Sequence, residues 1–162
     1  MLSKKLEKAI NDQIAFEFYS SYTYLAIAAY LETLDFGGIA SFFAKQAEEE
    51  IGHGMKFYNY VNEKGGIVRL DAIDKPKETY KDLVEIFETA LAHEELVTKK
   101  IYNIMDIAIE EKDYATRYFL DWFVEEQVEE EDTMRNLLTR VKRCKNDPSD
   151  AYILDKQLGE RE

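Results

Sequence analysis

The most informative stretch of this chain is Gln46-Ala47-Glu48-Glu49-Glu50-Ile51-Gly52-His53. Its glutamate and histidine, Glu50 and His53, are three residues apart, so a helix places both on one face. A row through them at alternating spacings of three and four is apolar at both ends and polar at its centre. The row contains Ile39, Phe43, Gln46, Glu50, His53, Phe57 and Tyr60. The stretch therefore predicts a buried helix with polar side chains at its middle.

Three other segments show the same arrangement. Rows of the same spacing run over 10–31, 83–108 and 120–141, and each is interrupted by polar residues near its centre. The main interruptions in the four rows are Glu17, Glu50, His53, Glu94, Gln127 and Glu130. Each lies roughly 13–19 residues, or about 20–29 Å of helix, from its hairpin turn. Antiparallel pairing would bring these residues to a similar depth in one core.

Four long helices are expected over residues 4–34, 40–64, 80–110 and 113–144. Turn signals separate the first pair at Asp35-Phe36-Gly37-Gly38 and the last pair near Glu111-Lys112-Asp113, and Lys64-Gly65-Gly66 ends the second helix. Short turns imply antiparallel hairpins, whereas the connection over 66–79 is long. The expected fold class is all-α, a four-helix bundle with a long crossover between its second and third helices.

The C-terminal segment follows Pro148 and carries a short apolar patch of Ala151, Tyr152, Ile153, Leu154 and Leu158. This patch predicts a short fifth helix from about Ser149 to Leu158, outside the bundle. A length of 162 residues suits one domain with one sizeable core. We therefore expect a single domain over 1–162, with the bundle in 1–145 and the short helix and tail in 146–162.

The composition is acidic, with a formal net charge of -12. This charge disfavours nucleic acid as a partner, because phosphates would be repelled, and it favours cations. The one cysteine, Cys144, allows no disulfide within the chain and is interpreted as a packing residue. The N-terminus lacks the apolar run of a signal peptide, and no apolar stretch is long enough to span a membrane. A soluble cytoplasmic protein is expected.

Carboxylates buried together require compensation, because they repel each other and take up protons. A pair of bound cations would remove this repulsion, and carboxylates with one imidazole suit iron or manganese. One acidic residue alone could equally be structural, since the chain has 33 of them. Four at matched depth, with His53 in a Glu-x-x-His motif, favour a metal site. The second histidine, His93, points about 100° away from Glu94 and is interpreted as structural.

At these residues the sequence resembles the bacterial and archaeal non-haem ferritins, over essentially the whole chain. The resemblance is most specific in 46–53 and in Trp122-Phe123-Val124-Glu125-Glu126-Gln127-Val128-Glu129-Glu130-Glu131. It implies a ferritin-like bundle with a di-iron site inside each subunit. The implied ligands of the first iron are Glu17, Glu50 and His53. Those implied for the second iron are Glu50, Glu94 and Glu130, with Glu50 bridging.

The resemblance also implies roles around this centre. Gln127 is implied to position water or dioxygen, and Tyr24, two helical turns after Glu17, to lie beside the two irons and supply an electron. Trp122 is expected near Tyr24. A third iron site is implied at Glu49, Glu126 and Glu129, which would share Glu130. Spacing supports this site because residues 126, 129 and 130 share one helical face. The neighbouring Glu125 and Glu131 are interpreted as a solvated acidic surface.

The implied function is iron storage with ferroxidase activity: Fe(II) is oxidised by dioxygen or peroxide, and the ferric product is stored as a mineral inside a hollow shell. The iron ions number two at the ferroxidase centre and one in the third site, and no haem is expected. The implied partners are other copies of this chain, in a shell of twenty-four subunits. In such shells the fifth helix lines the four-fold axis.

Related di-iron proteins fit less well. Oxygenases and manganese oxidases usually carry Glu-x-x-His twice, whereas the second motif here is Gln127-x-x-Glu130. Bacterioferritin is disfavoured on the same ground and by Ile51, where it has methionine. Rubrerythrins need four cysteine ligands, and DNA-protecting mini-ferritins lack the fifth helix. A storage subunit without ferroxidase activity would lack several of the ligands. Animal ferritins have an acidic pair at their three-fold channels where this chain has Arg117 and Leu120, so the route of iron inward stays open.

Overall fold

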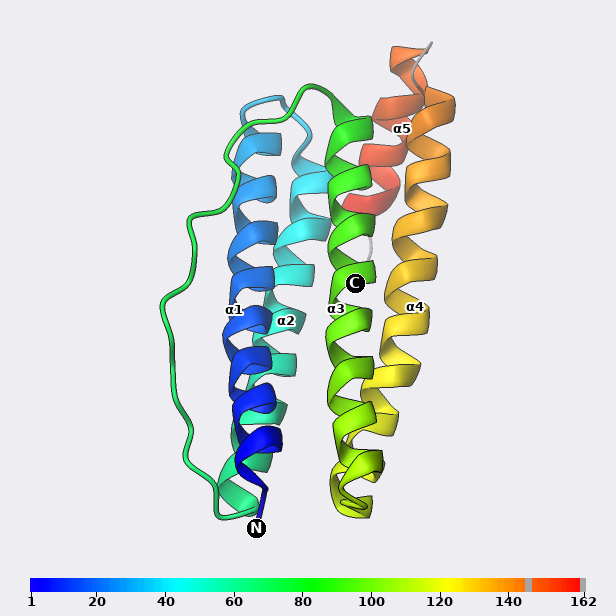
Figure 1. The fold of residues 1–162 in the computed structure, drawn as a ribbon. Helices are drawn as coiled ribbons and strands as arrows, with labels where there is room; N and C mark the ends of the chain where they lie inside the picture. The colour runs from blue at the N-terminus through cyan, green and yellow to red at the C-terminus, as the bar shows by residue number, and fades with distance from the viewer. Residues whose placement is uncertain (145–146, 161–162) are drawn as a thin grey trace.

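A computed structural model describes residues 1–144 and 147–160, and it contains five helices and no strand in these residues (Figure 1). The helices are α1 (Lys4–Glu32), α2 (Gly37–Glu63), α3 (Leu83–Glu110), α4 (Tyr114–Cys144) and α5 (Pro148–Gly159). The expected all-α bundle with a long crossover and a short fifth helix is confirmed. Residues 145 and 146, where we placed the boundary between bundle and C-terminal segment, lie outside the described residues.

The four long helices form two antiparallel hairpins, α1 with α2 and α3 with α4. Figure 1 shows the crossover between α2 and α3 running along the outer side of α1 from one end of the bundle to the other. Buried Asn11 on α1 fixes it, because its side-chain amide donates to the Ile67 carbonyl at 3.0 Å and accepts from Arg69 N–H at 2.6 Å. At the far end, the Tyr30 hydroxyl donates to the Tyr80 carbonyl at 2.6 Å. The crossover therefore connects the hairpins along the outside of α1, and it enters the core at its end, where buried Tyr80 joins the apolar cluster nearer α5.

Capping side chains fix where α1 and α3 begin, because the first N–H groups of a helix have no partner inside it. Ser3 Oγ accepts from Leu6 N at 3.0 Å, and Asp82 Oδ1 accepts from Glu85 N at 2.9 Å. The cap at Asp82 places the start of α3 at Leu83 rather than at residue 80.

The turn between α1 and α2 differs from the prediction. Gly37 and Gly38, which we expected in the turn, are the first residues of α2, and the left-handed residue is Asp35, with φ of 59°. Gly38 is needed because a Cβ there would lie 1.8 Å from the backbone oxygen of Asp155 in α5. Asp155 Oδ1 also accepts a hydrogen bond from Ile39 N at 2.8 Å. α5 therefore caps the start of α2, which has no side-chain cap of its own.

The core consists of two apolar clusters with a polar layer between them. The cluster nearer α5 includes Leu31, Phe43, Phe87, Met134 and Val141. The other cluster includes Ile10, Phe57, Ile101, Leu120 and Phe123. Between them lie buried polar residues from all four long helices: Glu17, Glu50, His53, Glu94, Gln127 and Glu130. The predicted rows, apolar at their ends and polar in the middle, thus meet at one level of the bundle.

Among the described residues, no helix combines the length and apolar character needed to cross a bilayer.

Candidate metal centre

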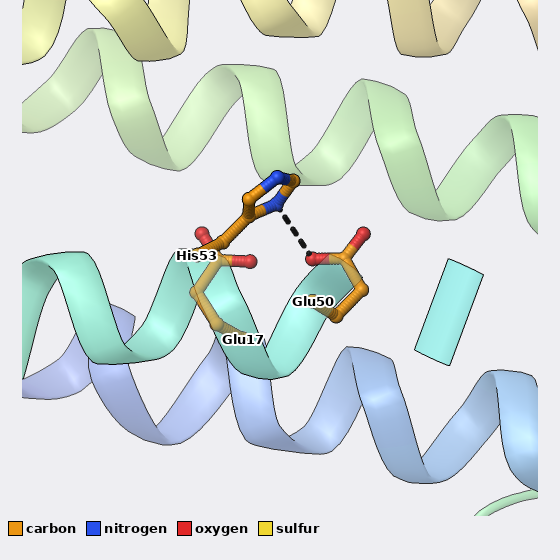
Figure 2. Close-up of side chains that lie close together, drawn as sticks. All are labelled: Glu17, Glu50 and His53. Atoms are coloured by element: carbon orange, nitrogen blue, oxygen red, sulfur yellow. Dashed lines mark hydrogen bonds and ion pairs between the residues drawn. The ribbon is translucent and has the colours of Figure 1, made fainter. Parts of the chain in front are cut away.

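The closest group of possible metal ligands joins α1 and α2. Glu50 and His53 lie one helical turn apart on α2, and Glu17 reaches the same place from α1, as Figure 2 shows. The three side chains are buried, and one ligand atom from each lies within 4.8 Å of the others. His53 Nδ1 lies 3.2 Å from Glu50 Oε2. Two carboxylates and an imidazole thus converge without a protein cation among them.

Glu17 presents one free oxygen to this cluster. Its Oε1 accepts a hydrogen bond from Gln13 Nε2 at 2.8 Å, while its buried Oε2 accepts none from the described residues. Burial, and next the charge of Glu50, raise the pKa of Glu17 well above its usual value. A buried oxygen without a donor is costly unless a proton or a cation meets it.

Glu94 reaches the layer from α3, where two donors hold its two oxygens. The Tyr24 hydroxyl donates to Oε1, and Gln127 Nε2 donates to Oε2 at 3.1 Å. Burial, followed by the charge of Glu94, raises the pKa of Tyr24 well above 10. Tyr24 therefore stays protonated and is the donor in this hydrogen bond. Burial raises the pKa of Glu94 itself. Tyr24 and Gln127 therefore both contact the carboxylate that the family resemblance implies for the second iron.

Glu130 completes the layer from α4. Its Oε2 accepts from Gln46 Nε2 at 2.9 Å, and burial, with the charge of Glu94, raises the pKa of Glu130 to about 7. Burial and the charge of Glu94 also raise the pKa of Glu50 well above 4.5. In the absence of cations, the four carboxylates therefore hold protons at pH values where exposed glutamates are ionised.

These donors suit a divalent cation. Carboxylate oxygens with one imidazole nitrogen match hard to borderline metals such as iron and manganese. The buried Oε2 of Glu17 gives a cation an oxygen that accepts no hydrogen bond from the described residues. Cations bound between the carboxylates would replace the protons and remove the repulsion that raises the pKa values.

The residues expected to form a third site lie at the edge of this layer. Glu49 and Glu129 are exposed, and Glu126 is half-buried. Among the described residues, Glu126 approaches the buried group with its Oε1 3.9 Å from His53 Nε2, and the charge of Glu49 acts on Glu50 and Glu130 from the surface. The structure thus places one of the three beside the cluster and leaves the others facing solvent, where a third ion would be less enclosed than the first two.

Trp122 lies against His53, with ring centroids 5.4 Å apart, and Lys56 Nζ lies 3.4 Å from the centroid of the indole. The ring contacts of Tyr24 in the described chain are with Phe43 and His93, so the expected closeness of Trp122 to Tyr24 does not show among them. Trp122 instead packs against the ring of His53.

The second histidine has a separate environment. His93 Nε2 lies 2.6 Å from Ser20 Oγ, and its ring stacks on Phe16 at 5.1 Å. Burial lowers the pKa of His93 to about 4, so it is neutral at physiological pH. These contacts agree with its interpretation as a packing residue.

Two residues that contact the site were absent from the predicted set. Gln13 bonds Glu17 and Gln46 bonds Glu130, and both are buried. Gln46 lies in the predicted row of the second helix, but its partner Glu130 is on α4. The row alone does not reveal that the two side chains meet. Gln13 lies outside the row of the first helix, and its signal is the spacing of four residues before Glu17.

Comparisons with known proteins agree with this geometry. A family model described as a ferritin-like domain matches residues 7–144. A bacterial non-heme ferritin of Staphylococcus aureus (strain USA300) is 41% identical over 161 residues, which cover 99% of this chain and 97% of the relative. An open-pore ferritin from the archaeon Archaeoglobus fulgidus, and a closed form of that ferritin made by mutagenesis, each superpose with a TM-score of 0.98 and 36% identity. Each superposition covers 100% of this chain and 99% of the archaeal ferritin chain.

Proposed function

Because the chain belongs to the ferritin-like family, we propose that it is an iron-storage ferritin that oxidises Fe(II) at the centre described above. The observation that carries the proposal is the layer of buried carboxylates between two apolar clusters, with Glu17, Glu50 and His53 offering ligand atoms within 4.8 Å of one another. A layer of this kind has no use in packing alone, because apolar residues would fill the same space at lower free energy.

In this proposal, Fe(II) is the substrate and the side chains bind it as the family resemblance implies. Glu17, Glu50 and His53 bind the first ion. The second ion is bound by Glu50, Glu94 and Glu130, with Glu50 shared. Two Fe(II) ions give up one electron each, and dioxygen with two protons becomes hydrogen peroxide. The protein binds both ions close together, so one oxidant can collect both electrons.

The surrounding residues have supporting roles. Gln127 holds Glu94 through its amide, and the Tyr24 hydroxyl donates a hydrogen bond to the same carboxylate, which places a phenol next to the second ion. A tyrosine there is placed to pass an electron to the oxidant, with Glu94 accepting the proton that leaves with it. Glu49, Glu126 and Glu129 are proposed as a third, more exposed iron site that shares Glu130.

The asymmetry of the two motifs favours passage of iron over permanent binding. Glu50-x-x-His53 gives the first ion an imidazole, whereas Gln127-x-x-Glu130 has an amide where a second glutamate would stand. The second ion is therefore held by carboxylates alone, without an imidazole, and in this proposal it leaves more readily. We propose that the ferric product moves to the interior of a hollow homo-oligomer, of which twenty-four subunits is the expected size. The cytoplasmic location stays a prediction from the sequence.

The two histidines of the chain provide a matched test. His53→Ala should slow the initial oxidation of Fe(II) in air by at least about tenfold, because it removes a ligand. His93→Ala should leave the initial rate close to that of the wild type, because His93 contacts Ser20, Phe16 and the ring of Tyr24 but none of the carboxylates. Absorbance of the ferric product measures both rates. Equal rates in wild type and His53→Ala would refute the assignment of the site.

A storage function needs a second measurement. Electron microscopy of the wild-type protein after prolonged loading should show dense iron cores of uniform size inside protein shells. If Fe(II) is oxidised but no iron is retained, the proposed storage function would be refuted and the proposed ferroxidase activity would stand.

A further inference from the structure

Three buried glutamines share one relation to the carboxylate layer. Gln13, Gln46 and Gln127 are only 2%, 4% and 3% exposed. Each donates through Nε2 to one glutamate, in the pairs Gln13–Glu17 at 2.8 Å, Gln46–Glu130 at 2.9 Å and Gln127–Glu94 at 3.1 Å. The family resemblance gives a role to Gln127 alone. Gln13 and Gln46 make the same kind of contact and have no role in the function proposed above.

The chemistry of these contacts is directional. A carboxylate on a long side chain has several rotamers, and a hydrogen bond to one oxygen selects among them. For Glu17 the consequence is visible, because Gln13 engages Oε1 while the buried Oε2 accepts no hydrogen bond from the described residues. The amide thus leaves one oxygen of the carboxylate available to a cation.

The two contacts are built differently. Gln13 and Glu17 lie one turn apart on α1, so their contact forms within one helix. Gln46 on α2 reaches Glu130 on α4, so this contact also fixes one helix against the other at the level of the site. The carboxylates belong to different proposed ions, Glu17 to the first and Glu130 to the second. Each glutamine is therefore linked to a different ion.

We propose that Gln13 and Gln46 are positioning residues of the metal centre, each holding one carboxylate oxygen so that the glutamate presents the other oxygen to a bound ion. The inference rests on the proposed function, because it requires metal binding at the layer. A glutamine that only satisfied core polarity would affect folding stability but not the affinity for metal. Partners that orient metal ligands typically contribute about 10- to 100-fold to metal affinity.

The variants that test this are Gln13→Met and Gln46→Met, in the full-length protein. Methionine has a similar length and helix propensity and fills space adaptably, but it lacks the amide donor. Thr23→Val is the control, since Thr23 is a buried polar residue of α1 whose hydroxyl has no hydrogen-bond partner among the described residues. Leucine variants at 13 and 46 replace any methionine variant that does not fold.

The main readout is Co(II) added to metal-free protein under nitrogen, because Co(II) has visible absorption that reports its coordination and does not need an oxidant. The wild type should bind two ions per chain. We expect Gln13→Met to weaken one of them, and Gln46→Met the other, by roughly 10- to 100-fold, with altered absorption bands. Thr23→Val should match the wild type. In Fe(II) oxidation, the half-saturating Fe(II) concentration should rise more than the maximal rate falls.

The outcomes separate this inference from the proposed function. Wild-type Co(II) affinity and spectrum in a glutamine variant would overturn the positioning role of that glutamine, with the metal centre left standing. An equal loss in Thr23→Val would also overturn it, because the effect would then come from general disturbance of the core. If the wild-type protein binds no Co(II), the proposed metal centre would be refuted, and this inference would be refuted with it.

Discussion

At the scale of single residues, the main physical feature is four glutamates buried in one layer. Their pKa values are raised by burial and by each other, so protons and cations compete for the same oxygens. Metal binding must release these protons. The centre is therefore expected to bind Fe(II) more weakly as the pH falls, and to stabilise the protein most when it is loaded.

In the metal-free protein, the proton held by Glu130 should have a measurable effect on folding stability. The pKa of Glu130 is about 7 when folded and near 4.5 when exposed, so between these values the folded chain holds a proton that the unfolded chain has lost. Stability then falls as the pH rises from about 4.5 to about 7, by roughly 3 kcal/mol from this group at 1.4 kcal/mol per pKa unit. Glu130→Gln cannot ionise and should lack this part of the decline.

Denaturant unfolding of the metal-free proteins at pH 5 and pH 8 measures the effect. At pH 5 wild type and Glu130→Gln should have similar stability, and at pH 8 the variant should be more stable than the wild type. The same difference at both pH values would show that Glu130 is ionised throughout, and that burial does not raise its pKa.

At the scale of helices, α5 is the element whose contacts most depend on the fold. Asp155 accepts from Ile39 N at 2.8 Å and so caps α2 from a helix far along the chain. Capping by a charged side chain at a helix N-terminus typically stabilises by about 1 kcal/mol. Asp155→Ala should therefore loosen α5 locally while leaving the bundle folded.

Hydrogen exchange measures this prediction. Amides of α5 and of the first turn of α2 should exchange roughly fivefold faster in Asp155→Ala, which corresponds to about 1 kcal/mol of local stability. Lys156→Ala, at the exposed neighbouring position, is the control and should exchange like the wild type. Unchanged protection in Asp155→Ala would mean that other contacts of α5, such as buried Leu154 and Leu158, hold it alone.

The four long helices and the polar level could be predicted from the sequence because helical periodicity reports which residues share a face. Periodicity says nothing about contacts between helices. It could not show that Gln46 meets Glu130, and the turn-forming residue types in 35–38 led us to place Gly37 and Gly38 in a turn. Gly38 is required by the close approach of Asp155, a residue more than a hundred positions later. Only the packed structure contains that information.

At the scale of the whole molecule, an apolar surface remains on the outer side of the first hairpin. A groove of about 620 Å³ lies between α1 and the crossover, and its lining includes Tyr22, Leu25, Tyr30 and Pro76. Tyr22 and Leu25 are 52% and 46% exposed. Contiguous apolar surface of this kind is typical of a protein interface. In the proposed shell we expect a second copy of the chain to cover this groove.

Leu25→Arg tests this face of the assembly, because a charged side chain without a partner is strongly unfavourable in an apolar interface. The variant should lose the large species that light scattering is expected to show for the wild type, and leave small oligomers or monomers. Co(II) binding should persist, because Glu17 and the other ligands are buried inside one chain, and this would show that the variant is folded. A large assembly of unchanged mass would mean that the groove between α1 and the crossover faces solvent in the shell, and that other surfaces join the subunits.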